Sequence, residues 1–431
     1  MRAYLRPNIT PMGAFPAGFL WGAATAAHQV EGGNVNSDCW ALEHAAPSLF
    51  AEPSGDAADH YHRFAEDIAI VADLGLNAWR FSIEWARIEP EPGFYSMAAL
   101  DHYRRCIDAC RAREVAAVVT FHHFTQPRWM ARLGGFGAAD FPARFADYCS
   151  CAARALEGMA AACTINELNL PLVAGRYFHD RVSPAARAAE AALGAPLSSF
   201  FLFSDEAAIL GQGLAAHAAA RAAIGAERPG VPVGMTLAIS EEDAGPGAEA
   251  LRDARRERLY APFLDAAAGD DFVGVQTYSR TVSRADGGAG PARGAVLTTM
   301  GWEDRPEALG AVCRWLSARW SIPIMVTENG YPGEDDSRRA AFIATAVEGL
   351  AEAIAQGADV RGYFYWSLLD NFEWLLGFGQ RFGLVAVDRA TQRRTVKPSA
   401  ATLGTLVRAA GTAGTKGAGL PLIGPSGAHR D

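Results

Sequence analysis

Lysine is nearly absent from this chain, which holds two lysines, Lys397 and Lys416, among 39 basic residues. We attribute the excess of arginine to the base composition of the genome rather than to function. Acidic residues outnumber basic ones, 48 to 39, and give a formal net charge of −9. Nucleic acids and anionic membranes are themselves negatively charged, so this balance disfavours both as partners. We therefore expect neither a nucleic-acid partner nor a membrane partner.

Long apolar runs are also missing. None approaches the roughly 18 residues of a membrane span, and the first eight residues hold no apolar stretch suited to a secretory signal. The seven cysteines are an odd number and form no C-x-x-C pair. This pattern is typical of reduced thiols rather than of disulfides or zinc sites. We expect a cytoplasmic protein that needs no metal and no other cofactor.

Eight short apolar runs recur along the 431 residues, with amphipathic patterns between them. Most are apolar at every position, which is typical of parallel strands buried on both faces. The runs are 19–24, 78–83, 115–124, 161–168, 231–239, 272–278, 323–328 and 362–368. This alternation predicts one (β/α)8 barrel over residues 1–410, with its active site at the carboxyl ends of the strands. A doubly wound open sheet is the alternative, but no G-x-G-x-x-G motif opens a helix after the first run.

The segments between the runs include helices and two long connections. Apolar stripes predict helices at 62–74 and 341–356. The stretches 179–204 and 280–298 exceed ordinary loop lengths and follow strands, so we expect them to shape the entrance of the site. Arg280, Arg284 and Asp286 in the second stretch are expected to be solvated loop charges. The glycine-rich tail 411–431 has no periodic pattern and is predicted to be disordered.

Two glutamates end two of the apolar runs. Glu167 follows Asn166 in the motif TINE, and Glu328 precedes Asn329 in the motif VTEN. In a parallel barrel, the carboxyl ends of different strands meet at one face. Two carboxyl groups in one cleft can protonate a leaving oxygen and stabilise an oxocarbenium-like transition state, which is what glycoside hydrolysis requires. For each glutamate alone, a salt bridge or a contact with backbone amides is the structural alternative.

A third motif, WSLLDNFEW at 366–374, places two tryptophans around a polar stretch. Sugars offer apolar C–H faces and a rim of hydroxyl groups, which suit an indole platform and a bidentate acceptor such as Glu373. Asp370, Asn371 and Glu373 are too polar for a buried strand without partners. The motif therefore favours a sugar site over a core strand with tryptophan at its ends.

Together these motifs resemble glycoside hydrolase family 1, the family of retaining β-glucosidases and β-galactosidases. The resemblance runs in order from Phe15 to about Ser399. The stretch FPAGFLWGAATAAHQVEG at 15–32 is similar to the opening strand of the family, and RFSIEW at 80–85 to its second. The 366–374 motif followed by RFG at 381–383 is the most specific match.

The resemblance implies a role for each matching residue. Glu167 matches the general acid/base and Glu328 the nucleophile of a double displacement, with carboxyl groups about 5–5.5 Å apart. Arg80 and Tyr278 match groups that contact the nucleophile, and a nearby cation would keep Glu328 ionised. The residues at the sugar-binding positions are Gln29, His123, Asn166, Trp366, Glu373, Trp374 and Phe382.

We expect from this a retaining exo-β-glycosidase, foremost a β-glucosidase, with galactosyl and fucosyl units as further candidates. Glu167 argues for O-glycosides, because the thioglucosidases of the family lack that carboxylate. Glu373 would repel the phosphate of a phosphorylated sugar. A transglycosidase that transfers the sugar to an alcohol is an alternative; an inactive sugar-binding protein is disfavoured because both glutamates are present. The expected partner is a small β-glycoside or oligosaccharide, and neither the aglycone nor the oligomeric state follows from the sequence.

The chain departs from the family pattern at two places. Leu168 follows Glu167 where the family has proline, and Gln276-Thr277 stand where it has Asn-Tyr. Proline restricts the residue before it, so we expect Glu167 to be less constrained here. These changes bear on rate and leaving-group preference rather than on the class of reaction.

Four histidines and one tryptophan are further candidates. His122 and His123 are neighbours on a predicted strand and must face opposite sides; the resemblance assigns His123 to the site. For His60 and His62 we expect a structural role, since no third metal ligand is in view. Trp302 matches a position near the cleft, and packing in the core is the alternative.

Overall fold

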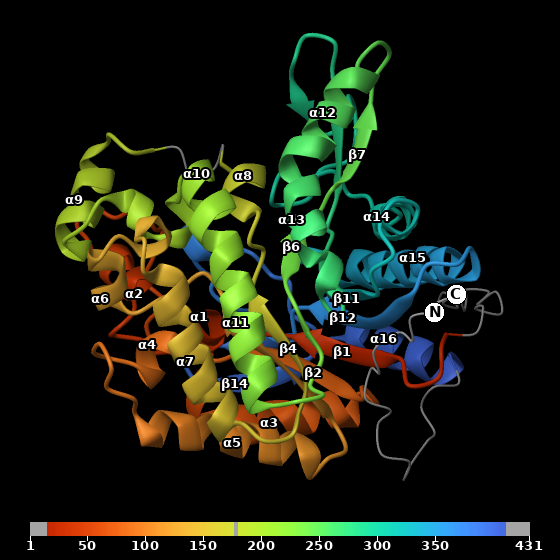
Figure 1. Cartoon of the computed structure of the whole chain (residues 1–431). Coiled ribbons are helices and arrows are strands. Elements are labelled where there is room, and N and C mark those ends of the chain that lie inside the picture. Colours follow the sequence, from red (N-terminus) through yellow and green to blue (C-terminus); the bar gives the residue numbers. More distant parts are fainter. Residues whose placement is uncertain (1–14, 176–179, 411–431) are drawn as a thin grey trace, which may run out of the picture.

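A barrel of parallel strands forms the centre of the computed structural model, which describes residues 15–175 and 180–410 (Figure 1). Nine parallel segments pair in the order β5, β4, β3, β2, β1, β12, β11, β8, β6. Met235 alone separates β5 from β6, so these two are one interrupted strand that closes the barrel at eight positions. The predicted (β/α)8 fold is confirmed, and all eight runs are strands. They are β1 (Leu20–Ala24), β2 (Ala78–Ser82), β3 (Ala116–His122), β4 (Met159–Ile165), β5 (Val233–Gly234), β6 (Thr236–Ala238), β8 (Val273–Gln276), β11 (Ile324–Asn329) and β12 (Val360–Trp366).

Neighbouring residues of each strand face two different apolar layers. Leu20 belongs to the cluster inside the barrel, whereas Trp21 belongs to the larger cluster between the barrel and the helices. Both sides are buried, which explains why the runs are apolar at every position. The interior is tight: a Cβ atom added at Gly22 would lie 2.5 Å from the ring of Phe364.

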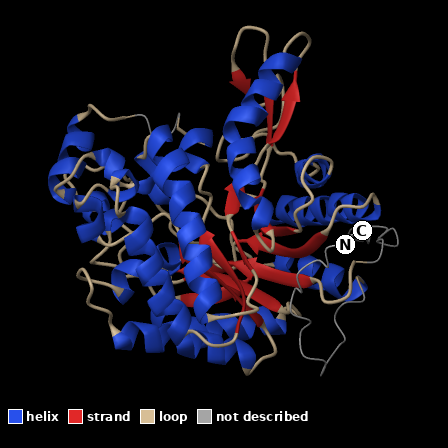
Figure 2. Ribbon diagram, viewed as in Figure 1, coloured by secondary structure: helices blue, strands red, loops and turns tan. Residues whose placement is uncertain are grey.

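Helices surround the barrel and connect its strands (Figure 2). The longer ones are α3 (His60–Asp73), α5 (Met97–Arg111), α7 (Phe141–Ala155), α9 (Pro184–Leu193), α11 (Leu214–Glu227), α12 (Glu249–Leu259), α14 (Ala308–Ser317), α15 (Asp336–Ala355) and α16 (Pro398–Ala409). The shorter ones are α1 (Ala27–Val30), α2 (Asp38–Glu43), α4 (Trp85–Ile88), α6 (Arg128–Arg132), α8 (Leu170–Val173), α10 (Glu206–Ala208) and α13 (Ala261–Ala266). Both predicted helices are present, as α3 and α15. Helix α15 begins before the predicted position 341 because the side chain of Asp335 accepts a 3.0 Å hydrogen bond from the N–H of Arg338 and caps it.

The two connections predicted as long loops contain regular structure. The first includes α9, whose start is capped by the hydroxyl of Ser183. The second forms β9 (Arg280–Ser283) and β10 (Ala289–Gly290), which join β7 (Glu241–Ala244) in a small sheet. Together with α12, β7 belongs to the projection at the top of Figure 1.

The prediction that Arg280 is a solvated loop charge is wrong. Arg280 lies in β9 and is only partly exposed, and its guanidinium forms ion pairs with Glu303 (2.6 Å) and Asp243 (3.1 Å). Arg284 donates to the carbonyl of Pro291, at 2.6 Å. The sequence could not reveal these partners, because they come from neighbouring segments of the projection.

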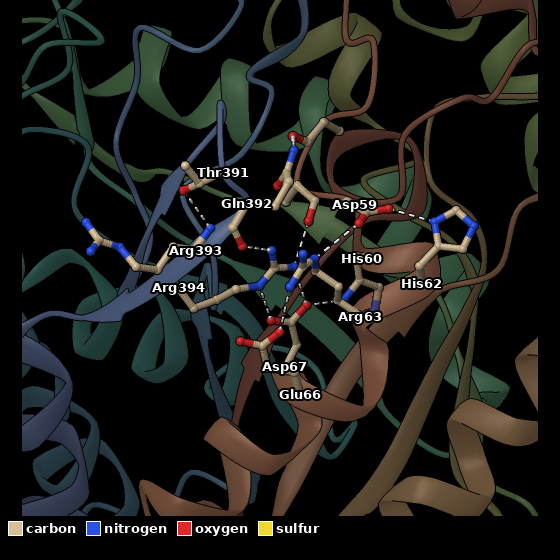
Figure 3. A network of polar contacts seen from close by, with 12 residues as sticks. Asp59, His60, His62, Arg63, Glu66, Asp67, Thr391, Gln392, Arg393 and Arg394 are labelled. Carbon is tan, nitrogen blue, oxygen red and sulfur yellow. Dashed lines mark hydrogen bonds and ion pairs between the residues drawn. The ribbon is translucent and has the colours of Figure 1, made fainter.

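A buried polar network joins helix α3 to the hairpin of β13 (Val385–Asp388) and β14 (Arg393–Val396) (Figure 3). Nδ1 of His60 contacts the carboxylate of Asp67 at 2.7 Å, and Arg394 donates two hydrogen bonds to the same carboxylate, at 2.8 and 2.9 Å. Burial alone would raise the pKa of Asp67, but the hydrogen bonds from Arg394 and His60 outweigh it and lower the pKa. This network is the structural role expected of His60.

Asp67→Ala is expected to lower the free energy of unfolding by about 3–5 kcal/mol, because it leaves Arg394 buried without its carboxylate. The folded-state pKa of Asp67 lies below its unfolded value, so its stabilising effect is present above the unfolded pKa and is lost as pH falls through the folded pKa. Urea titrations at neutral and acid pH measure both effects. Asp73→Ala, at an exposed position of the same helix, is the control; equal losses in the two variants would contradict the assignment.

The seven cysteines are all free thiols, as predicted from their number and spacing. In the part of the chain that the structure describes, no helix combines the length and the apolarity that crossing a bilayer requires. The tail 411–431, predicted to be disordered, lies outside the described residues.

Candidate active site

A cleft of about 720 Å³ opens at the carboxyl ends of the barrel strands. Ten of the eleven residues predicted for the site line it, and they come from segments that follow or end different strands. The ten are Gln29, His123, Asn166, Glu167, Tyr278, Glu328, Trp366, Glu373, Trp374 and Phe382. The eleventh, Arg80 on β2, is fully buried and contacts two of them, Asn166 and Glu328.

Both oxygens of Glu328 are held by fixed donors. Nη1 of Arg80 donates to Oε1 at 2.6 Å, and the hydroxyl of Tyr278 donates to Oε2 at 2.6 Å. The carboxylate is 4% exposed and sits in β11, so its backbone is fixed by the barrel. Because Arg80 and Tyr278 come from strands on either side of β11 in the sheet order, only the closed barrel brings the three together.

Glu167 follows β4 and has a left-handed backbone, with φ of 45°. Its N–H donates to the hydroxyl of Thr236 at 3.0 Å. The next residue, Leu168, donates its own N–H to the carbonyl of Thr236 at 3.2 Å. Proline has no N–H and could not make this second bond. One bond from Glu167 and one from Leu168 tie this segment to Thr236 on β6, so in the absence of proline a hydrogen bond that proline would forbid helps to hold the backbone.

Burial and neighbouring charges give the two glutamates different pKa values. Burial and repulsion by Glu328 raise the pKa of Glu167 well above its usual range, and the more distant charge of Arg80 opposes this only in part. Burial also raises the pKa of Glu328, but the guanidinium of Arg80 and the hydrogen bond from Tyr278 oppose this, so that its pKa is raised while that of Glu167 is raised well above its usual range. Glu328 therefore ionises first and Glu167 keeps its proton to higher pH, a division that suits a nucleophile and a proton donor.

The direction of the hydrogen bonds around Asn166 follows from Arg80, which can only donate. Nη2 of Arg80 contacts Oδ1 of Asn166, so Nδ2 of Asn166 faces Nε2 of His123 at 3.2 Å and donates to it. Burial, with Arg80 and His122 adding to it, lowers the pKa of His123 well below its ordinary value. His123 is therefore neutral, with its proton on Nδ1.

Gln276 belongs to this network, although the sequence marked it only as a departure from the family. Its Nε2 donates to Oδ1 of Asn166 at 2.8 Å and to the hydroxyl of Thr236 at 3.2 Å. Its Oε1 is buried and has no hydrogen-bond partner among the described residues. Gln276 on β8 pairs with Glu328 on β11 in the register of the sheet, and this pairing marks Gln276 as part of the site.

A second wall of the cleft carries Gln29 and Glu373. Nε2 of Gln29 donates to the carbonyl of Phe372 at 2.7 Å and lies 3.4 Å from Oε2 of Glu373. Burial and the charge of Glu328 raise the pKa of Glu373 to about 8, against the hydrogen bond from Gln29. The carboxyl group therefore holds a proton near neutral pH and can both donate and accept hydrogen bonds.

Aromatic rings close this part of the cleft. His123 is stacked between Trp366 and Trp374, at centroid distances of 5.8 and 6.2 Å. Behind Trp374, the ring of His28 is stacked at 5.8 Å with an interplanar angle of 9°. The sequence analysis missed His28, whose place beside Gln29 in the opening motif was the only signal.

Tyr278, Trp302 and Phe382 form a second aromatic group, with centroid distances of 5.4 to 6.3 Å. Trp302 lines the cleft, so of its two expected positions the one near the cleft is correct. His122, by contrast, packs against Phe136 at 5.3 Å and away from the cleft lining, as expected from the alternation along a strand.

One group of described residues has the composition of a metal site: His28, Cys39 and Glu43, all buried. Nε2 of His28 already contacts Glu43 at 3.3 Å, and the other carboxylate oxygen accepts from Ser54 at 2.6 Å. Burial and the charge of Glu43 raise the pKa of the Cys39 thiol well above its usual value, which disfavours the thiolate that a metal needs. We interpret the group as support for the ring that stacks on Trp374.

Known proteins with similar sequences or folds match nearly the whole chain. The model of glycosyl hydrolase family 1 matches residues 12–285 and 276–412. A thermostable β-glucosidase B from Thermobispora bispora is 33% identical over 90% of this chain and 89% of its own. A bifunctional β-D-glucosidase/β-D-fucosidase from Bifidobacterium breve is 31% identical over 89% of this chain and 96% of its own. The crystal structure of β-glycosidase BGL167 superposes with a TM-score of 0.87 and 49% identity, covering 93% of this chain and 97% of that one.

The barrel, the paired carboxyl groups and these similarities define a glycoside hydrolase acting on O-glycosyl bonds. The chain belongs to glycosyl hydrolase family 1.

Proposed function

We propose that this protein is a retaining exo-β-glycosidase that releases terminal non-reducing β-D-glucosyl units. The observation that carries the proposal is the unequal setting of the two carboxyl groups: Arg80 and Tyr278 hold both oxygens of Glu328, whereas burial keeps Glu167 protonated. The names of the relatives support glucose as the sugar, and the bifunctional relative adds fucose as a second candidate.

In the proposed reaction, Glu328 attacks the anomeric carbon while Glu167 gives its proton to the leaving oxygen. The glycosyl–enzyme ester is then opened by water, from which Glu167 takes a proton. Arg80 and Tyr278 keep the attacking carboxylate ionised and oriented. The retaining geometry predicts about 5–5.5 Å between the two carboxyl groups.

The same proposal assigns the rest of the predicted residues to the sugar. Gln29 and Glu373 face hydroxyls at one end of the ring, and Trp366 supplies the platform for its apolar face. Asn166 touches Arg80, which holds Glu328, so it lies nearest the hydroxyl beside the anomeric carbon. His123, Trp374 and Phe382 complete the pocket.

Hydrolysis of a panel of 4-nitrophenyl α- and β-glycosides, followed by proton NMR of the first product, tests the proposal. We expect the β-glucoside to be among the best substrates and β-glucose to appear before its α-anomer. An α-anomer as first product would exclude the double displacement. Product ratios with added alcohol distinguish hydrolysis from a transglycosidase.

Gln276→Leu tests the network behind Asn166. Loss of the amide that donates to Oδ1 of Asn166 is expected to lower kcat on a β-glucoside about tenfold, the effect of roughly 1.4 kcal/mol for one hydrogen bond. KM should change little, since bonds to the hydroxyl beside the anomeric carbon strengthen in the transition state.

The matched comparison uses the 2-deoxy-β-glucoside, which lacks that hydroxyl. On it, Gln276→Leu should cost less than about twofold relative to the unmutated enzyme, and Gln276→Asn should restore part of the loss on the normal substrate. An equal fall on both substrates would mean that Gln276 only supports the fold.

A further inference from the structure

The outer part of the cleft has a different chemistry from the sugar pocket. Its walls hold six large apolar side chains that are at least partly exposed to the cleft: Leu170, Leu172, Val173, Met300, Trp302 and Leu376. We call these six residues the outer cleft. Leu376 is the most exposed of the six, at 46%.

The outer cleft lies where a leaving group must be. Helix α8, which carries three of its residues, begins three positions after Glu167, the proposed proton donor to the leaving oxygen. Trp302 packs against Tyr278 at 5.4 Å, and Tyr278 contacts Glu328. Leu376 follows two residues after Trp374 of the sugar pocket. The aglycone therefore leaves the pocket between these apolar side chains.

Three polar side chains of the cleft lining, those of Arg255, Arg280 and Thr299, are engaged with other protein groups. Arg255 holds Glu242 through two hydrogen bonds of 2.9 and 3.0 Å, and Arg280 holds Glu303. The hydroxyl of Thr299 donates to Gln380 at 2.6 Å. Among the lining residues that the structure describes, the only carboxylates are the three of the sugar pocket.

We propose that the natural leaving group is an apolar alcohol, alkyl or aryl, rather than a second sugar. A second sugar would bring hydroxyl groups against Leu172 and its apolar neighbours, whose side chains offer no hydrogen bond in return, and this costs free energy. An alkyl or aryl group buries apolar surface there instead, worth about 0.8 kcal/mol for each fully buried methylene. This inference rests on the proposed β-glycosidase activity and adds the class of aglycone.

The test is a homologous series of methyl, butyl, hexyl and octyl β-D-glucosides, with cellobiose for comparison. The leaving alcohols have similar acidity, so differences report contacts of the chain rather than chemistry. We expect kcat/KM to rise about two- to fourfold for each added methylene up to hexyl, and hexyl glucoside to exceed cellobiose. A flat or falling series, or a clear preference for cellobiose, overturns the proposal.

Two variants locate the effect. Leu172→Asp places a charge in the outer cleft and should flatten the series, with a loss of kcat/KM that grows from the methyl to the octyl glucoside. Leu133→Asp, at a half-exposed leucine outside the cleft, should leave the series unchanged. A slope that survives Leu172→Asp would overturn the assignment to these side chains. If the enzyme hydrolyses none of the β-glucosides, including the 4-nitrophenyl one, the proposed function itself fails; a flat series on an active enzyme rejects only the aglycone.

Discussion

Glu328→Ala is expected to lower kcat for 4-nitrophenyl β-D-glucoside by at least about 10⁴-fold, the largest effect of any substitution in this chain. The variant has no atom that can form the covalent bond to the anomeric carbon, and it loses the negative charge that stabilises the oxocarbenium-like transition state. An activated leaving group cannot compensate, because the missing group is the nucleophile and not the proton donor.

The experiment must distinguish the loss of the nucleophile from a loss of folded structure. Alanine leaves Arg80, which is fully buried, without its carboxylate, so Glu328→Gln, of nearly the same size, is the second variant. Glu348→Ala, at an exposed glutamate of α15, is the control and should keep full activity. Azide added to the alanine variant can enter the vacated space and should yield the α-glycosyl azide. Activity within tenfold of the unmutated enzyme in both variants would contradict the role of Glu328.

Glu167→Gln should separate substrates by their leaving groups. For alkyl β-glucosides, kcat/KM should fall on the order of 10²–10⁴-fold, because the leaving alkoxide needs a proton. For 2,4-dinitrophenyl β-glucoside, whose phenolate leaves unaided, kcat/KM should fall less than about tenfold. The parameter kcat/KM is the right one, since it reports the first displacement and not the later attack by water. An equal loss on both substrates would remove Glu167 from the role of proton donor.

The pH profile gives an independent check on the same residue. Burial and the charge of Glu328 raise the pKa of Glu167, and the protonated form is the active one in the first step. In the unmutated enzyme, kcat/KM for alkyl glucosides should therefore fall as pH rises through the raised pKa of Glu167. Glu167→Gln should lose this alkaline limb and keep the acid limb, on which Glu328 becomes protonated. An unchanged alkaline limb would assign it to another group, with Glu373 the first candidate.

The sequence predicts the architecture because each barrel strand has an apolar pattern that can be recognised. The eight apolar runs are all strands, and the two motifs that contain Glu167 and Glu328 lie at the same end of the barrel. A parallel strand buried on both faces must be apolar at nearly every position, so its pattern is local and readable. The site residues followed from motifs that resemble one family, and ten of the eleven line a single cleft.

The sequence did not reveal the hydrogen bonds that govern reactivity, because their partners come from distant strands. Without proline after Glu167, the sequence predicted a looser backbone, whereas the N–H of Leu168 makes a bond to Thr236 that proline would forbid. Gln276 looked like a minor change from the family, yet its extra length lets it donate to Asn166.

The sequence by itself determined the barrel, the two carboxyl groups and the aromatic motif, since each of these follows from a pattern of consecutive residues. Tertiary structure alone decided how Arg80 orients Asn166 and His123, that the N–H of Leu168 bonds to Thr236, and that the cleft continues into apolar side chains. The physical reason is that acidity and specificity arise from distances of 3 Å or so between groups. Those distances exist only after the eight strand positions close into one barrel.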